Sequence, residues 1–164
     1  GKIGKSELNL LEKIISNSIQ IVKLENFDID IKKNVVLISA DHQSTLLSEA
    51  ASASFHADGW QVYSLGDMSS SIDVLFDLDL QKLLTKVWKP GAGMMVIVVF
   101  SSTPESMKFF AESVNSIKAK SRRNLHLAVC GDMKKNAGIK ADLIEEDVEA
   151  ILQWSQTTFE SSTS

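Results

Sequence analysis

The segment Met94–Phe100 restricts the fold more than any other, because all of its residues, MMVIVVF, are apolar. It has the length of a strand and is far shorter than the ~20 residues that a membrane-spanning helix needs. A strand that is apolar at every position has to be covered on both faces, which is typical of the central strand of a parallel sheet. The segment therefore predicts an α/β fold.

Strand and helix patterns alternate around this segment. Strand patterns occupy 34–39, 60–65, 94–100, 125–130 and 141–144, and helical patterns occupy 43–58, 71–88, 104–120 and 147–159. Such alternation predicts a doubly wound parallel sheet with right-handed crossovers. We expect five strands in the flavodoxin-like order 2-1-3-4-5. In the first of these helices, the expected inner face carries Leu47, Ala50, Ala51, Ser54 and Phe55, and His56 faces solvent.

The residues before the first strand carry a different pattern. From Ser6 to Lys23, apolar residues recur every three or four positions, which predicts an extra N-terminal helix. Residues 24–33 then form a linker or a short edge strand. We therefore expect a helix and linker over 1–33, an α/β domain over 34–159 and a disordered tail over 160–164.

Composition narrows the functional classes. The net charge is −4, which does not suit a domain that binds nucleic acid directly. The single cysteine, Cys130, has no partner within the sequence for a disulfide, and we expect a cytoplasmic location. Neither a G-x-S-x-G nor an H-E-x-x-H motif is present. The opening GKIGKS has only two residues between its glycines, where a phosphate-binding loop needs four. No enzymatic activity and no association with membranes are predicted.

Polar side chains follow three of the predicted strands. In an open α/β sheet, ligands bind outside the carboxyl ends of the strands. His42 in the first loop could ligate a metal, with Asp41 or Ser44 orienting it. The candidate binding residues are Asp41, His42, Ser44, Ser101, Ser102, Thr103 and Gly131. The same residues could also do no more than cap helices and end strands.

The first loop, the strand 34–39 and the stretch HADGWQVYSLGD at 56–67 resemble the cobalamin-binding (vitamin-binding Rossmann-like) domain family. The resemblance covers residues 34–156 and includes KADLIEEDVEAILQW at 140–154. It is nearest to the sensory versions in MerR-type light-responsive repressors and in the heme-binding SCHIC domains of antirepressors. The helix expected over 6–23 is similar to the helical segment that precedes the domain in such regulators.

The family motif is D-x-H-x-x-G after the first strand, S-x-L after the third and G-G after the fourth, and the chain departs from each. If Asp41 is the motif aspartate, Gln43 and Leu46 stand at the His and Gly positions. If His42 is the motif histidine, Ala40 and Thr45 replace the Asp and the Gly. The later turns read Ser-Ser-Thr at 101–103 and Cys-Gly at 130–131.

The resemblance implies a non-enzymatic sensory or regulatory domain of a cytoplasmic signalling or transcription-control protein. It would bind heme, a cobalamin or a protein partner at the carboxyl edge of the sheet, with His42 as the axial ligand. The implied partner is a DNA-binding regulator or a fused DNA-binding domain, and self-association is left open. The alternatives are a ligand-free interaction module of the same fold and a subunit of a cobalamin-dependent enzyme. A phosphoacceptor receiver is disfavoured, because Phe100-Ser101 stands where its aspartate belongs.

Overall fold

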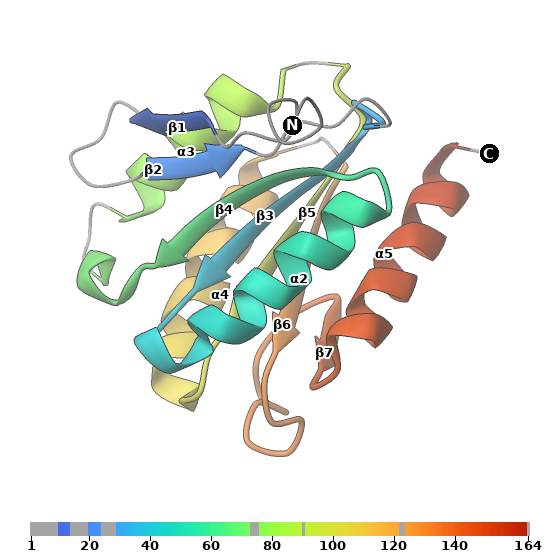
Figure 1. Ribbon diagram of the computed structural model, residues 1–164. Helices are drawn as coiled ribbons and strands as arrows, with labels where there is room; N and C mark the ends of the chain where they lie inside the picture. Colours follow the sequence, from blue (N-terminus) through green and yellow to red (C-terminus); the bar gives the residue numbers. More distant parts are fainter. Residues whose placement is uncertain are drawn as a thin grey trace, which may run out of the picture.

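The computed structural model describes residues 10–13, 20–23, 29–72, 76–89, 91–121 and 124–163. Its centre is a sheet of five parallel strands, as the sequence predicts. The strands are β3 (Lys33–Ser39), β4 (Gln61–Asp67), β5 (Met94–Phe100), β6 (Leu125–Cys130) and β7 (Leu143–Glu145). Their spatial order is β4-β3-β5-β6-β7, which is the predicted order 2-1-3-4-5. The fold is therefore flavodoxin-like (Figure 1).

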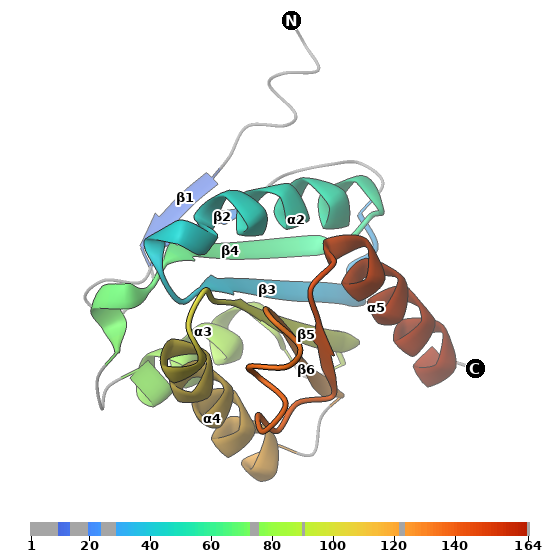
Figure 2. The same cartoon turned by 90° about the horizontal axis from the view of Figure 1, so that it is seen from below.

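Helices cover both faces of this sheet (Figure 2). The helices α2 (Thr45–Ala57) and α5 (Val148–Thr163) lie on one face, and α3 (Phe76–Val87) and α4 (Pro104–Lys120) lie on the other. Alternate residues of β5 point into two separate apolar clusters, one beneath each pair of helices. Every residue of β5 is buried, because the strand lies between its parallel neighbours and under both helix layers.

The prediction of an N-terminal helix was wrong. Leu10–Lys13 (β1) and Gln20–Lys23 (β2) are strands rather than parts of a helix. They pair antiparallel with each other, and β2 pairs antiparallel with β4. Without β2, the outer N–H and C=O groups of β4 would lack sheet partners, and an edge of that kind is normally covered. The predicted positions 6–9 and 14–19 lie outside the described residues.

Two further predictions need correction. Helix α5 continues to Thr163, so residues 160–163 are helical where a disordered tail was expected. In α2, Leu47 and Ala50 are exposed, and the buried residues are Ser48, Ala51 and Phe55. The 3-10 turn η1 (His42–Ser44) starts the helix so that Ser44 is buried in line with them. His56 is half-buried rather than fully solvent-facing.

Candidate functional site at the carboxyl edge of the sheet

The turns that follow β3, β5 and β6 meet at one edge of the sheet. Ser39 lies opposite Phe100 in the pairing of β3 with β5, and Phe100 lies opposite Cys130 in the pairing of β5 with β6. The three strands thus end in register, and the next residues of each leave the sheet side by side. The predicted gathering of the turns that carry Asp41, Ser101 and Gly131 is therefore present.

Asp41 joins two of these turns through both of its carboxylate oxygens. Oδ1 accepts hydrogen bonds from the backbone N–H of Ser44 at 3.0 Å and from its hydroxyl at 2.8 Å. Oδ2 accepts from the backbone N–H of Ser102 at 2.8 Å, from the Ser102 hydroxyl at 3.0 Å and from the Ser101 hydroxyl at 3.2 Å. The carboxylate is therefore supplied with donors on both oxygens.

These contacts decide the ionisation of Asp41. Burial alone would raise the pKa of its carboxyl group, since it disfavours the charged form. The hydrogen bonds from the Ser102 N–H and from the hydroxyls of Ser44, Ser102 and Ser101 outweigh burial and hold the pKa below the ordinary 3.8. Asp41 is thus a stable anion at neutral pH, which is the opposite of what a general acid needs.

The turn after β5 also caps a helix, as its composition allowed. Thr103 accepts a hydrogen bond from the N–H of Ser106 at 3.3 Å through its side chain, and Pro104 opens α4. The Ser101 hydroxyl shares its single hydrogen between Asp41 and the carbonyl of Thr103, at 2.8 Å, and accepts from the Thr103 N–H at 3.1 Å, so its geometry is fixed from both sides. Ser101 and Thr103 are therefore occupied in holding the turn.

Gly131 lies in a space that the protein itself fills. A Cβ atom at this position would stand 2.8 Å from Nδ2 of Asn136, 3.2 Å from the carbonyl oxygen of Ser101 and 3.3 Å from Cε of Met107. Asn136 is buried and donates from Nδ2 to the carbonyl of Asp132 at 2.8 Å. The glycine allows these neighbours to approach closely, and the space beside it holds the Asn136 amide.

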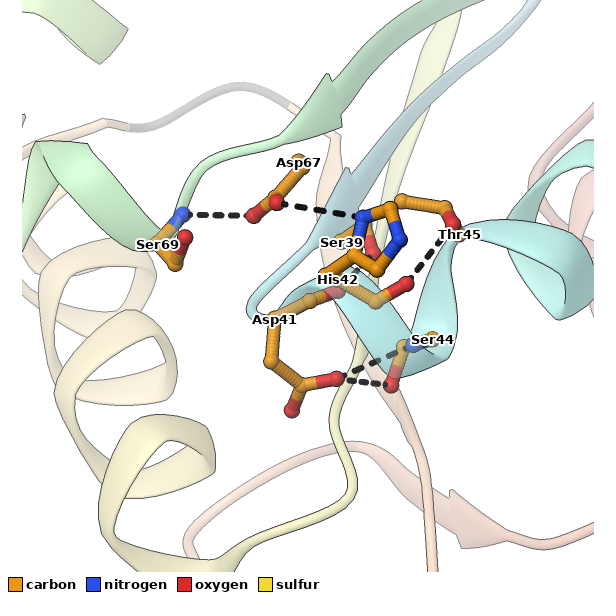
Figure 3. Close-up of polar contacts among 7 residues, drawn as sticks. All are labelled: Ser39, Asp41, His42, Ser44, Thr45, Asp67 and Ser69. Atoms are coloured by element: carbon orange, nitrogen blue, oxygen red, sulfur yellow. Dashed lines mark hydrogen bonds and ion pairs between the residues drawn. The ribbon is translucent and has the colours of Figure 1, made fainter.

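His42 is the exception to this packing. Its side chain is 90% exposed, and its Nδ1 lies 3.8 Å from Oδ2 of Asp67 at the end of β4 (Figure 3). Asp67 is itself held by the backbone N–H of Ser69, which donates to Oδ1 at 2.9 Å. The carboxylate that lies near the His42 ring is therefore that of Asp67, whereas the predicted partners, Asp41 and Ser44, bond to each other. The second ring nitrogen, Nε2, has no hydrogen-bond partner among the described residues and belongs to an exposed side chain.

Sequence reasoning did not identify Asp67 and Asn136 as site residues. Asp67 had a detectable signal, because it directly follows Gly66 at the end of a predicted strand and so reaches the same edge. Asn136 had none, because it lies five residues beyond Gly131 in an irregular loop. Only the folded loop shows that its amide returns to the glycine.

Comparisons with known proteins give no family for the chain: no protein-family model matches it, and no curated protein matches it. Among the described residues, no group of three or more His, Cys, Asp or Glu side chains is placed to hold a metal ion. Burial raises the pKa of the Cys130 thiol to about 12, so this cysteine is a poor nucleophile at neutral pH. None of the helices in the described ranges could cross a membrane.

A separate pair of titratable groups at the start of β6 leads to a prediction. Burial lowers the pKa of His126 below its ordinary 6.5, although the carboxylate of Asp142 acts in the opposite direction. The folded chain therefore resists protonation of His126, while the unfolded chain takes up the proton. Between about pH 7 and pH 5 the free energy of unfolding should fall as the pH falls. Urea unfolding over this range measures the slope, and His126→Gln should flatten it; an unchanged slope would exclude His126 as the cause.

Proposed function

We propose that this chain is a non-enzymatic regulatory module of a cytoplasmic signalling or transcription-control protein and that it acts by binding a protein partner at the carboxyl edge of the sheet. One observation carries the proposal. Both carboxylate oxygens of Asp41 are supplied with donors from the β3 and β5 turns, while each of three turns exposes a large side chain. These side chains are His42 after β3, Ile72 after β4 and Met133 after β6.

The closed network around Asp41 favours a protein partner over a small polar ligand. A ligand that needed hydrogen bonds from Ser101 or Ser102 would have to break their bonds to Asp41, which leaves a charged group without its donors. A protein surface can instead bury Ile72 and Met133, which are 41% and 46% exposed, and leave the network intact. Such apolar anchors supply much of the affinity in protein interfaces.

The size and charge of the edge indicate the kind of partner. The strands β4 and β6 are three positions apart in the sheet, which is roughly 14 Å at about 4.8 Å per strand. This span suits a single helix of roughly 10–12 Å diameter. Asp132, Glu146 and Asp147 are exposed at the same edge and outnumber the exposed Lys134 and Lys135 of the β6 turn, and the chain has a net charge of −4. A partner with a basic surface, such as a DNA-binding regulator or a fused DNA-binding domain, fits these charges.

Site-specific photo-cross-linking in the native cell tests this proposal. A benzoylphenylalanine placed at Ile72 and, in a second variant, at Met133 should cross-link to the same partner, because one docked surface covers both turns. The same probe at Thr157, an exposed position on α5, is the control and should give no such product. Different partners at the two edge positions, or equal yield at Thr157, would contradict the proposal.

A second candidate is a tetrapyrrole sensor, and the pairing of His42 with Asp67 favours it. A histidine that ligates a metal commonly has its other ring nitrogen directed at a carboxylate, which orients the ring and raises its basicity. His42 stands in this relation to Asp67 and is exposed. Heme or a cobalamin would then bind over the β3 and β4 turns, with His42 as axial ligand and Asp41, Ser44, Ser101, Ser102, Thr103 and Gly131 beneath it.

His42→Ala separates the two candidates. The substitution should change the free energy of unfolding by less than about 0.5 kcal/mol, because the side chain is 90% exposed. Any spectral change therefore reports on ligation rather than on folding. Titration with hemin and with hydroxocobalamin should give the same spectra for the variant and the parent chain if the protein-binding candidate holds. A saturable Soret or corrin shift that His42→Ala abolishes would favour the tetrapyrrole sensor.

A further inference from the structure

The outer face of α2 is apolar, and among the described parts of the chain nothing covers it. Leu46 is 77% exposed and Leu47 is 41% exposed, although both are large aliphatic side chains. Further along the helix, Ala50, Ala53 and Ala57 are also exposed. The views of the fold show α2 on the outside of the sheet, with its inner side against the strands (Figures 1 and 2). This face, Leu46, Leu47, Ala50, Ala53 and Ala57, is referred to below as the outer α2 face.

We infer that the outer α2 face packs antiparallel against the same face of a second copy of the chain, around a twofold axis. Leu46, Ala50, Ala53 and Ala57 are spaced by four, three and four residues, which is the spacing of a seam between two packed helices. The small side chains at three of these positions allow the helices to approach to about 8 Å, the close end of the usual range.

The two ends of the seam complement each other in size. In the antiparallel arrangement, Ala50 meets the partner's Ala53, and Leu46 meets the partner's Ala57. The large Leu46 at one end of the helix therefore lies over the small Ala57 of the partner. The twofold axis produces this contact twice. In a parallel arrangement, Leu46 would meet the partner's Leu46 and leave the alanine end loosely packed.

Charge favours the same arrangement. Glu49 and His56 are the charged or titratable residues of α2, and they lie one heptad apart beside the seam. Antiparallel packing brings the carboxylate of Glu49 to the imidazole of the partner's His56, again twice. Parallel packing would instead place the Glu49 and His56 flank of each helix on opposite sides of the pair, so that Glu49 would not meet the partner's His56. A second copy is thus complementary to this face in both size and charge.

The pairing of the two α2 helices leaves the carboxyl edge of each copy accessible to the partner that we propose above. Helix α2 is a crossover between two parallel strands, so it runs antiparallel to them. Two antiparallel α2 helices therefore direct the two carboxyl edges to opposite ends of the dimer. The inference stands independently of the proposed function, because His42, Ile72 and Met133 are not part of the seam.

Sedimentation of the whole chain over a range of concentrations up to millimolar tests the inference. The chain should dimerise reversibly, and Ala53→Arg should weaken dimerisation at least about tenfold by placing two like charges at the axis. Thr157→Arg, which adds the same charge at an exposed position on α5, should leave the dimer unchanged. Circular dichroism should show that both variants remain folded. A monomer at every concentration, or equal effects of the two substitutions, would overturn the inference.

Cysteine pairing tests the orientation of the helices. Ala50→Cys and Ala53→Cys chains, mixed and oxidised, should form the mixed disulfide in preference to either homodimer, since the antiparallel seam sets these two positions opposite each other. The native Cys130 is buried, with a pKa raised to about 12, and so should not compete. Preferential linkage of each variant to itself would indicate a parallel pair and contradict the antiparallel seam.

Discussion

Asp41→Ala should lower the free energy of unfolding by about 2–4 kcal/mol, although Asp41 is only half-buried. The substitution removes a charged acceptor that holds the N–H groups of Ser44 and Ser102 and three hydroxyl groups around it. It also removes the side-chain cap of η1, and the loss of a cap by itself typically costs about 1 kcal/mol. Urea unfolding at neutral pH measures the change.

Two further variants separate the proposed causes of this loss. Asp41→Asn keeps one acceptor oxygen but loses the charge, and it should cost about half as much. Asp67→Ala is the matched control at the same edge, because among the described residues Asp67 accepts a hydrogen bond from Ser69 alone, besides its contact with His42. If Asp67→Ala proved as damaging as Asp41→Ala, the stabilisation would not be specific to the network that links the β3 and β5 turns.

Gly131→Val should destabilise the fold by about 2–3 kcal/mol, with Gly131→Ala at roughly half of that. The added Cβ would meet Nδ2 of Asn136 at 2.8 Å and the carbonyl oxygen of Ser101 at 3.2 Å. The Asn136 amide can rotate away, but the Ser101 carbonyl belongs to a backbone that also carries the Asp41 network. The larger side chain therefore adds to a crowding that already begins at the Cβ atom.

Gly138 supplies the control for this prediction. It lies in the same loop, and a Cβ built there has no neighbour within 4 Å, so Gly138→Val should change stability by less than about 0.5 kcal/mol. Removing the nearest obstacle, through Asn136→Ala in the Gly131→Ala background, should recover part of the loss as a measurable coupling energy. Additive effects of the two substitutions would show that Asn136 does not fill the space beside Gly131.

The sequence predicted the structure best where all residues of a segment are buried alike. Met94–Phe100 is apolar throughout and is the central strand, and the strands that alternate with helices around it lie in the predicted order. Helix α2 was less predictable: Ala51 and Phe55 are buried as expected, but Leu47 and Ala50 are exposed and Ser48 is buried in their place. The 3-10 turn η1 sets the rotation of the helix so that Ser44 is buried in line with the inner residues, and apolar periodicity alone does not predict this rotation.

The prediction for the N-terminal region was wrong for a related reason. A spacing of three or four apolar residues over 6–23 predicts a helix, yet Leu10–Lys13 and Gln20–Lys23 are strands. Their strand conformation is completed by β4, whose edge lies far away in sequence, so a local pattern cannot report it.

The candidate site, too, was predictable only in part. The positions of Asp41, Ser101 and Gly131 at one edge follow from topology and were predictable. The hydrogen-bond partners of these side chains were not predictable, because the bonds from Ser101 and Ser102 to Asp41 span 60 and 61 residues. Whether these polar groups await a ligand or already satisfy one another depends on side-chain geometry that appears only in the folded protein.

The pKa of the Asp41 carboxyl group tests most directly whether the carboxyl edge is closed by its own side chains. An NMR titration that follows the Asp41 carboxyl carbon and the Ser102 backbone N–H should give one common midpoint below 3.8, with the Ser102 signal moving as its bond to the carboxylate is lost. A midpoint at or above 3.8, together with a Ser102 signal that does not respond, would contradict the account.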